Sequence, residues 1–430
     1  MSDFMEKQIP DDLKEDLDFS TWKDWYLFVQ FLFYFSQGAA FAAILLIAPF
    51  LQTLGYLEDE ALTIQSIIFI PWLIKIVFGI LSDTVKVGKF GRRKPYILIA
   101  GLIGIIGWIS LPMYTSPHWS IILIGMFVTG SVALGDTVLD SLGVDVTPPN
   151  RRGWMQGVAW GARGGGAILS GVFLGVWGNQ LGWRYSYLII GIFAVVGIMS
   201  ALLIKEADNI PKVYLADFGR EFRKGVTWHV TLFDFISGMG IALVSVMVTF
   251  MSEVLDLDIE TAGVGTIGWG LVFFSVGQLI GALSIGGLGQ KLNLLWVFVI
   301  NAIVYTGFIL SFLWIDFEAL GAPELSFPTV LYLLVLLLGA INGGYETSQM
   351  RISMEYSAKV SRGSLTGTMY NWYNSMSNLG QLSIGTLIIA QLIGAGIRYP
   401  VAMQLSAIAL VLSLIPGILL IKKLKLDRKQ

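Results

Sequence analysis

Long apolar stretches, separated by short charged loops, constrain this chain of 430 residues more than any other feature. A helix of about 20 apolar residues is long enough to cross the hydrocarbon core of a bilayer. We therefore expect an all-α protein with twelve transmembrane helices. The stretches that predict them are 25–54, 62–81, 96–114, 121–146, 155–181, 185–204, 228–254, 263–283, 294–313, 329–354, 366–393 and 397–421.

The scarcity of charge agrees with a location in the bilayer. Charged residues make up 13% of the chain and hydrophobic residues 55%, whereas soluble proteins carry about 25% charged residues. The chain has no cysteine and two histidines, which excludes thiolate sites and leaves little room for a metal centre. Its net charge of −2 provides no attraction to nucleic acid. We expect an integral membrane protein without a cofactor or a metal.

Basic residues predict which ends of the helices face the cytoplasm. The loop between the second and third stretches, the charged segment 205–224 and the C-terminal tail are rich in Lys and Arg. The loops on the opposite side are mainly acidic. Because loops rich in Lys and Arg stay in the cytoplasm, we expect both termini and the central segment on the cytoplasmic side of the inner membrane.

An internal repeat relates the two halves of the chain at an offset of 210 residues. This offset places Asp136 on Glu346, Asp145 on Glu355 and Arg152 on Arg362. The alternative is that helix ends attract Gly and Arg independently of any repeat. We expect two pseudo-symmetric six-helix bundles with a binding site between them near the membrane midplane. The predicted parts are an N-terminal cytoplasmic segment 1–24, a first bundle 25–204, a cytoplasmic linker 205–226, a second bundle 227–421 and a basic cytoplasmic tail 422–430.

The segment 79–95 carries the most specific motif, G-I-L-S-D-T-V-K-V-G-K-F-G-R-R-K-P. It resembles the signature loop between helices 2 and 3 of the major facilitator superfamily, although Asp83 lies eight residues before Gly91 instead of three. The end of the motif, 90–95, resembles glycoside and sucrose transporters. The preceding P-W-L-I-K at 71–75, and the acidic residues of helix 4, are similar to folate–biopterin transporters and muropeptide permeases. The resemblance implies a secondary transporter that moves a small organic solute by alternating access.

Charged residues near the cytoplasmic helix ends suit a gate. Asp83 can pair with a nearby arginine or accept hydrogen bonds from the N-terminus of a facing helix, which would hold the cytoplasmic side closed. The alternative is that the basic cluster only sets the topology. The predicted gating residues are Asp83, Arg92, Arg93, Asp145, Arg152, Glu355 and Arg362.

Three charges are expected at one depth inside the first bundle. At 1.5 Å per residue, Lys75 and Asp136 lie about 20 and 22 Å from the outer ends of their helices, and Arg163 about 12 Å from the cytoplasmic end of its helix. Ionisable residues inside a membrane are costly and usually functional. Asp136 could neutralise either cation and leave the other for an anionic solute. The alternative is a purely structural ion pair.

Buried carboxylates are the candidates for carrying a coupling proton. Asp136 and Asp140 are four residues apart and share one face of their helix. Glu346 occupies the repeat-related place, with no basic residue at matching depth in helices 7 to 9. Desolvation favours the protonated form of such groups, so we expect these three residues to couple transport to protons. Asp234 is a weaker candidate, with helix capping or pairing to linker cations as the alternative.

Polar side chains recur on one face of two helices. A stripe of amides facing lipid would be prohibitively costly, so these faces contact protein or water. Hydrogen bonds between helices and the lining of a solute cavity explain the stripes equally well. The predicted substrate-binding residues are Lys75, Arg163, Gln30, Tyr34, Gln37, Tyr370, Asn371, Asn374 and Asn378.

Together these features predict a monomeric, proton-coupled transporter of a small organic anion, which is not an enzyme. No phosphate-binding loop follows the glycines at 161–166, so ATP-driven transport by this chain is not expected. The alternatives are a sugar or glycoside symporter and a non-transporting assembly or pigment-delivery factor.

Overall fold

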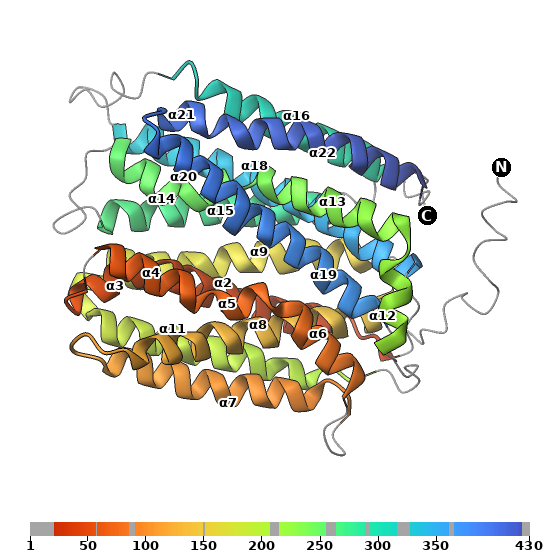
Figure 1. The fold of residues 1–430 in the computed structure, drawn as a ribbon, viewed down its shortest axis with the longest axis horizontal. Coiled ribbons are helices and arrows are strands. Elements are labelled where there is room, and N and C mark those ends of the chain that lie inside the picture. The colour runs from red at the N-terminus through yellow and green to blue at the C-terminus, as the bar shows by residue number, and fades with distance from the viewer. Residues whose placement is uncertain are drawn as a thin grey trace, which may run out of the picture.

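The computed structural model describes residues 21–56, 58–85, 91–148, 151–206, 215–254, 264–288, 292–315, 327–360 and 365–423. Within these ranges every regular element is a helix, and the long helices run side by side (Figure 1). The predicted all-α membrane fold is therefore confirmed.

The first six predicted stretches all contain helices, several of them interrupted. The first is divided into α2 (Tyr26–Leu45) and α3 (Ile47–Thr53), and the second into α4 (Glu58–Ile68), α5 (Ile70–Leu73) and α6 (Lys75–Thr84). Next come α7 (Lys94–Ser110) and α8 (Ser120–Val146). The fifth stretch forms α9 (Arg152–Ser170), the π-helical segment η5 (Gly171–Val176) and α10 (Gly178–Leu181), and the sixth forms α11 (Trp183–Ser200).

The last six stretches form a second series of helices. They are α13 (Gly225–Gly240) with α14 (Leu243–Val254), α15 (Val264–Leu288), α16 (Leu294–Ser311) and α18 (Phe327–Val360). The last two stretches form α19 (Thr366–Asn378), the π-helical segment η8 (Leu379–Gly385) and α20 (Thr386–Gly394), followed by α21 (Tyr399–Ala402) and α22 (Gln404–Lys423). The repeat offset moves η5 onto 381–386, so both halves carry a π-helical segment at nearly the same place.

The predicted linker contains a short helix, α12 (Leu215–Phe222), that the charge pattern did not predict. Its Phe218 is buried and packs with the core of the second series of helices. This apolar contact explains why a charged segment folds against the bundle. Figure 1 places α12 at the same end of the molecule as the end of α22.

Ten helical segments of the described chain are long and apolar enough to cross a membrane. The α4–α6 run is excluded because it is broken into short pieces around Pro71, which lacks a backbone N–H. The α9 helix is excluded because it contains Gln156, Arg163 and many glycines. The two exceptions to the twelve predicted spans are thus a helix that is broken into short pieces and a helix that is rich in glycine and polar residues.

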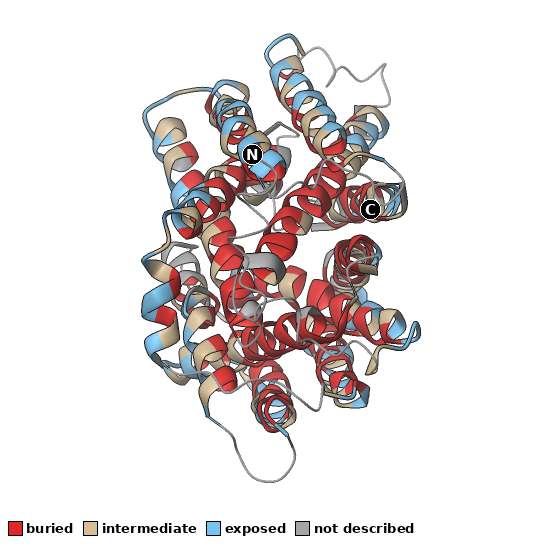
Figure 2. Ribbon diagram, turned by 90° about the vertical axis from the view of Figure 1, so that its right-hand side faces the viewer, coloured by how far each residue is buried: buried red, intermediate tan, exposed pale blue. Residues whose placement is uncertain are grey.

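The outer surface of the bundle is apolar. Seen end-on, buried residues lie toward the middle of the helix assembly and exposed residues toward its outside (Figure 2). Exposed side chains include Leu102, Ile192, Ile300 and Ile415, each more than half accessible. A soluble protein does not expose so many large apolar side chains, so this surface fits contact with lipid.

Each half has a core of its own. Trp108 and Tyr187 belong to a cluster of the first half, whereas Phe233, Phe298 and Tyr345 belong to a cluster of the second. The halves pack closely where α9 crosses α15, because a Cβ atom added to Gly157 would lie 2.7 Å from Cα of Gly286. The small residues of α9 therefore place its polar face at the interface between the halves.

Candidate solute-binding site

An ion pair between Lys75 and Asp136 lies in the interior of the first half. Nζ of Lys75, on α6, contacts Oδ2 of Asp136, on α8, and both side chains are almost completely buried. Nε2 of Gln37 donates to Oδ1 of Asp136 at 2.5 Å. Nζ of Lys75 also lies 5.1 Å from the ring centroid of Trp72. Asp136 therefore neutralises Lys75 and not Arg163, the other cation of this layer.

Arg163, on α9, is held between aromatic rings. Its Cζ atom lies 4.6 Å from the ring centroid of Phe41 and 4.9 Å from that of Trp160, which is cation–π geometry. No ion pair to Arg163 is found in the described part of the chain. Glu346, on α18 of the second half, interacts with its charge at longer range. Arg163 is thus a cation whose hydrogen-bonding groups can receive an anion.

A polar pocket lies against these groups. The empty space there is about 280 Å³, a volume that includes space open to solvent. Residues of both halves line it, so the pocket lies at the predicted interface. The lining residues are Tyr34, Gln37, Trp72, Lys75, Asp136, Gln156, Trp160, Arg163, Tyr370, Asn374 and Asn378.

A chain of hydrogen bonds crosses from the first half to the second beside the pocket. The Tyr34 hydroxyl donates to Oδ1 of Asp140. Nδ2 of Asn374, on α19, donates to Oδ2 of the same carboxylate at 3.3 Å, and Nδ2 of Asn378 donates to Oδ1 of Asn374 at 3.4 Å. The Asp140 carboxylate therefore joins α2, α8 and α19.

Glu346 is buried beside the pocket and does not line it. Its Oε2 atom accepts a hydrogen bond of 2.9 Å from Nε2 of Gln278, on α15. Within the described residues, no basic side chain of helices 7 to 9 contacts Glu346. Arg163, the cation that acts on Glu346, comes from helix 5 of the other half.

Two of the predicted substrate-binding residues lie away from the pocket. Asn371 is buried, and its Nδ2 lies 3.0 Å from the Thr137 carbonyl and 2.9 Å from Oγ of Ser141, so it fastens α19 to α8. Gln30 is buried close to Gly143. The other seven, including Tyr370, line the pocket.

Four aromatic or amide residues of the site were missing from the predicted set. Gln156 and Trp160 precede Arg163 at helical spacing, so all three share one face of α9. Trp72 lies one helical turn before Lys75. These spacings could have identified the residues. Phe41 contacts Arg163 only because α2 and α9 pack closely, which no local pattern predicts.

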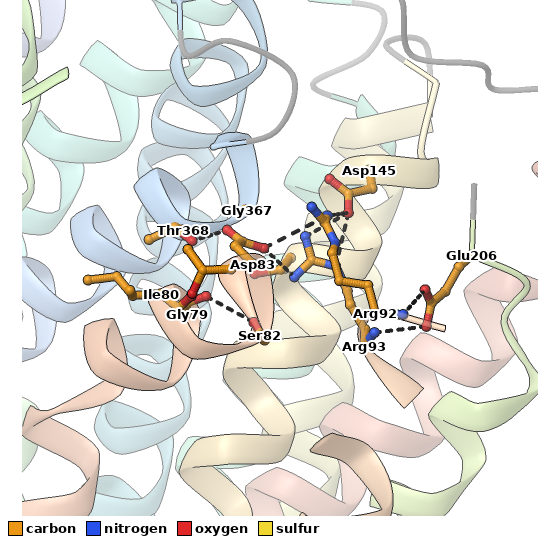
Figure 3. A network of polar contacts seen from close by, with 12 residues as sticks. Gly79, Ile80, Ser82, Asp83, Arg92, Arg93, Asp145, Glu206, Gly367 and Thr368 are labelled. Atoms are coloured by element: carbon orange, nitrogen blue, oxygen red, sulfur yellow. Dashed lines mark hydrogen bonds and ion pairs between the residues drawn. The ribbon is translucent and has the colours of Figure 1, made fainter. Parts of the chain in front are cut away.

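Four of the predicted gating residues, Asp83, Arg92, Arg93 and Asp145, form a buried cluster (Figure 3). Oδ1 of Asp83 lies 3.0 Å from Nη1 of Arg93, and Oδ2 of Asp145 lies 2.7 Å from Nη2 of the same arginine. Arg92 also contacts Asp145, at 3.1 Å. Burial alone would lower the pKa of Arg93, but Asp145 and Asp83 raise it above its ordinary value. The Arg93 guanidinium therefore stays ionised between its two carboxylate partners.

Contacts between the halves extend this cluster. The Thr368 hydroxyl, near the start of α19, donates to Oδ2 of Asp83 (Figure 3). Nη1 of Arg152 lies 3.4 Å from Oε2 of Glu355, on α18. We call these two contacts the latch. The predicted gating residue Arg362 lies outside the described residues.

Glu206 is a member of this region that was not predicted. Its carboxylate accepts hydrogen bonds from the backbone N–H groups of Arg92, Arg93 and Lys94, with N···O distances of 2.8, 2.9 and 2.9 Å (Figure 3). These are otherwise unpaired groups at the start of α7. Gly91 has a φ of +101°, and a Cβ atom there would lie 2.8 Å from the Glu206 carboxylate. The positive φ and this close approach explain the glycine of the motif.

Comparisons with known proteins agree with this architecture. A family model described as Major Facilitator Superfamily matches residues 26–264, more than half of the chain. A folate-biopterin transporter of Synechocystis sp. is 29% identical over 201 residues, covering 46% of this chain and 40% of the relative. Probable folate-biopterin transporter 4 of Arabidopsis thaliana is 27% identical over 214 residues, covering 47% and 43%. The matched part spans less than half the length of these relatives.

Solved structures share the whole fold at low sequence identity. The E. coli fucose:proton symporter FucP has a TM-score of 0.65 at 16% identity, with 92% of this chain and 98% of that chain covered. A bacterial homologue of the iron transporter ferroportin, in an outward-facing state, has a TM-score of 0.61 at 16% identity, with 92% and 99% covered. The matched family model and the shared fold together show that the chain belongs to the Major Facilitator Superfamily, whose members are transporters and not enzymes.

Proposed function

We propose that this protein is a monomeric secondary transporter that moves an anionic, ring-bearing organic solute of the folate or pterin class together with a proton. The observation that carries the proposal is Arg163, held between Phe41 and Trp160 at the wall of a pocket shared by both halves. A guanidinium group binds carboxylates and phosphates through paired hydrogen bonds. The names of the relatives supply the solute class.

The aromatic lining suits a planar ring. Tyr34, Trp72, Trp160 and Tyr370 surround the pocket, and aromatic side chains favour stacked or edge-on contacts with other rings. The amides of Asn374 and Asn378 can hydrogen-bond the heteroatoms of such a ring. An anionic group on Arg163 and a ring among the aromatic side chains would then fill the pocket.

Arg163 also links solute binding to proton binding. In the absence of a solute its charge stabilises the buried carboxylate of Glu346. An anionic solute that engages Arg163 reduces this stabilisation, so Glu346 takes up a proton as the solute binds. The further predicted proton-coupling groups are Asp136, which pairs with Lys75 inside the first half, and Asp140, which accepts a hydrogen bond from Asn374 of the second half. The anion and the proton that Glu346 binds then cross in the same step.

The two halves, 25–204 and 227–421, would rock around this site. The latch residues would close the cytoplasmic end, with both termini in the cytoplasm and the chain in the inner membrane. The solved structures that share the fold are described as outward states of FucP and of the ferroportin homologue, which agrees with closure at this end.

Uptake into proteoliposomes tests the proposal. Purified protein is reconstituted, and an inwardly directed proton gradient is applied with radiolabelled folic acid outside. We expect accumulation above the external concentration that a protonophore abolishes. Gradient-driven uptake of fucose without uptake of folate would favour the alternative sugar symporter. An absence of flux for every solute would overturn the transporter proposal.

The Glu346→Gln variant tests the coupling step. A permanently neutral side chain cannot carry a proton, so we expect folate to equilibrate across the membrane without accumulating. Asp217→Asn, which removes a carboxylate from the surface helix α12, is the matched control and should accumulate folate like the wild type. Uphill uptake by Glu346→Gln would remove Glu346 from the mechanism.

A further inference from the structure

A second buried carboxyl group lies in the other half, away from the pocket lining. Asp234, on α13, is completely buried and faces α18. Nε2 of Gln349 donates to its Oδ1 atom at 3.0 Å. Oγ of Ser353 lies 2.8 Å from Oδ1 and 2.7 Å from Oδ2. All the hydrogen-bond partners of Asp234 in the described structure are neutral.

The charged groups on the elements around α13 are engaged elsewhere or exposed. On α18, Glu346 accepts from Gln278, Arg351 interacts with Glu355 and lines a different cavity, and Glu355 pairs with Arg152. On α12, Glu221 pairs with Lys224. His229 of α13 and the lysines at the end of α22 are exposed. The titratable groups that act on Asp234 at longer range are the phenols Tyr345, Tyr370 and Tyr373.

The geometry around Asp234 suits a carboxylic acid. An ionised carboxylate buried without a cation is costly enough that such a group is usually protonated. Ser353 has a single hydroxyl proton, yet its oxygen lies within hydrogen-bond distance of both carboxyl oxygens. Both contacts become good hydrogen bonds when Oδ2 itself carries a proton and donates it to Ser353. Oδ1 then accepts from Gln349.

The same network reaches the helix that lines the pocket. Nε2 of Gln349 also donates to Oγ of Ser377, on α19, at 3.0 Å. Next to this contact α13 and α19 touch through their backbones, because a Cβ atom added to Gly238 would lie 2.0 Å from the Ser377 carbonyl oxygen. Asn374 and Asn378 of α19 line the pocket. A shift of α19 as the solute binds would therefore disturb the partners of Asp234.

We propose that Asp234 is a proton-binding site of the second half, which holds a proton on Oδ2 in the described arrangement and releases it when α19 moves. On release the O–H bond breaks, the carboxylate keeps the electron pair, and the proton passes to water that enters between the moving helices. Gln349 and Ser353 then both donate to the carboxylate. The release step rests on the proposed transport function, whereas proton binding does not.

Infrared spectroscopy of the purified full-length protein, without any solute, tests proton binding. Asp234→Asn should lose one component of the protonated-carboxyl C=O band at neutral pH. Ser353→Ala should keep that component and shift it to higher frequency, because the carboxyl group loses a hydrogen-bond partner. Asp217→Asn should leave the band unchanged. A full, unshifted band in both Asp234→Asn and Ser353→Ala overturns the proposal, and Ser353→Ala alone decides it if Asp234→Asn fails to fold.

Proton counting tests the release step. A pH dye inside proteoliposomes, together with radiolabelled folic acid, gives the number of protons that enter per folate. We expect this ratio to fall by one in Asp234→Asn relative to Asp217→Asn. An unchanged ratio overturns release during transport. If the wild type moves no folate, the transport proposal fails, and the infrared band still decides whether Asp234 binds a proton.

Discussion

At the scale of single residues, the interior of the first half depends on how Lys75 and Asp136 compensate each other. Removing two charges from water is costly, and their attraction offsets this cost only with good geometry and further hydrogen bonds. Gln37 and Trp72 supply those additional contacts. Removing one partner would leave the other charge buried without compensation.

A double-mutant cycle tests this dependence. Lys75→Met should lower the free energy of unfolding by about 3–5 kcal/mol, because the Asp136 carboxylate then stays buried without its partner. Adding Asp136→Asn to that variant should restore most of the loss. Unfolding of the purified protein in SDS–detergent mixtures measures all three variants. A double variant as unstable as Lys75→Met would show that the pair does not act as a unit.

Arg163 provides the second prediction at this scale. Arg163→Gln should raise the Kd for folate more than tenfold, equivalent to about 1.4 kcal/mol or more. Arg163→Lys should recover only part of the affinity, because an ammonium group keeps the charge and loses the planar stacking between Phe41 and Trp160. Equilibrium binding of radiolabelled folic acid measures both variants. Equal Kd values for the wild type and Arg163→Gln would exclude Arg163 from the binding site.

At the scale of elements, glycines set the distance between helices. A Cβ atom added to Gly281, on α15, would lie 1.8 Å from the carbonyl oxygen of Ala340, on α18. A Cβ atom added to Gly277, one turn earlier, would lie 2.0 Å from the Leu336 carbonyl oxygen. Such stripes of small residues let membrane helices pack backbone to backbone.

A pair of alanine substitutions tests this packing. Gly281→Ala should destabilise the protein by about 1–3 kcal/mol, because the added methyl group forces α15 and α18 apart. Gly307→Ala, on α16, is the matched control, since a Cβ atom there meets nothing within 4 Å. Thermal unfolding in detergent measures both variants. Equal melting temperatures would contradict the packing argument.

The helices themselves were predictable, whereas their interruptions were not. Long apolar stretches require helices in a bilayer, so every predicted stretch contains one. The breaks around Pro71 have a local cause, whereas the two π-helical segments follow no local pattern that we used. The depths calculated from residue positions along the helices likewise placed Lys75, Asp136 and Arg163 in one layer of the membrane. It left open which cation Asp136 neutralises, because that choice depends on how α6 and α9 are oriented around α8.

At the scale of the whole molecule, the two halves meet along α9 and α15 and are joined at one end by the latch. Asp83 has two roles there, since it pairs with Arg93 inside the first half and accepts from Thr368 of the second. Because Asp83 and Arg93 both belong to the first half, their ion pair persists when the halves separate. Separation then breaks the Thr368 hydrogen bond and the pair between Arg152 and Glu355, together with the hydrogen bonds of Asn371 to α8.

Weakening the latch should shift the balance between the two open states. Hydrogen bonds to charged groups contribute about 1.5–3 kcal/mol, so Thr368→Val should raise the population open at this end about tenfold or more. Spin labels on Val85→Cys and Lys422→Cys report the separation, and the chain has no native cysteine that would add background labelling. Thr306→Val, whose hydroxyl bonds only within α16, is the control. An unchanged distance distribution in Thr368→Val would contradict the role of the latch.

The polarity of α9 also bears on how the protein is made. A helix with Arg163 near its middle does not partition into lipid by itself, since an arginine there costs about 2.5–3.5 kcal/mol during insertion. During synthesis α2 is already present and covers one side of α9, where Gly166 approaches the Phe35 carbonyl. The other side, with Gly157 and Gly164, packs against α15, which is made about a hundred residues later. We therefore expect one face of α9 to stay uncovered in the membrane until α15 is inserted, so that the first half completes its folding only with the second.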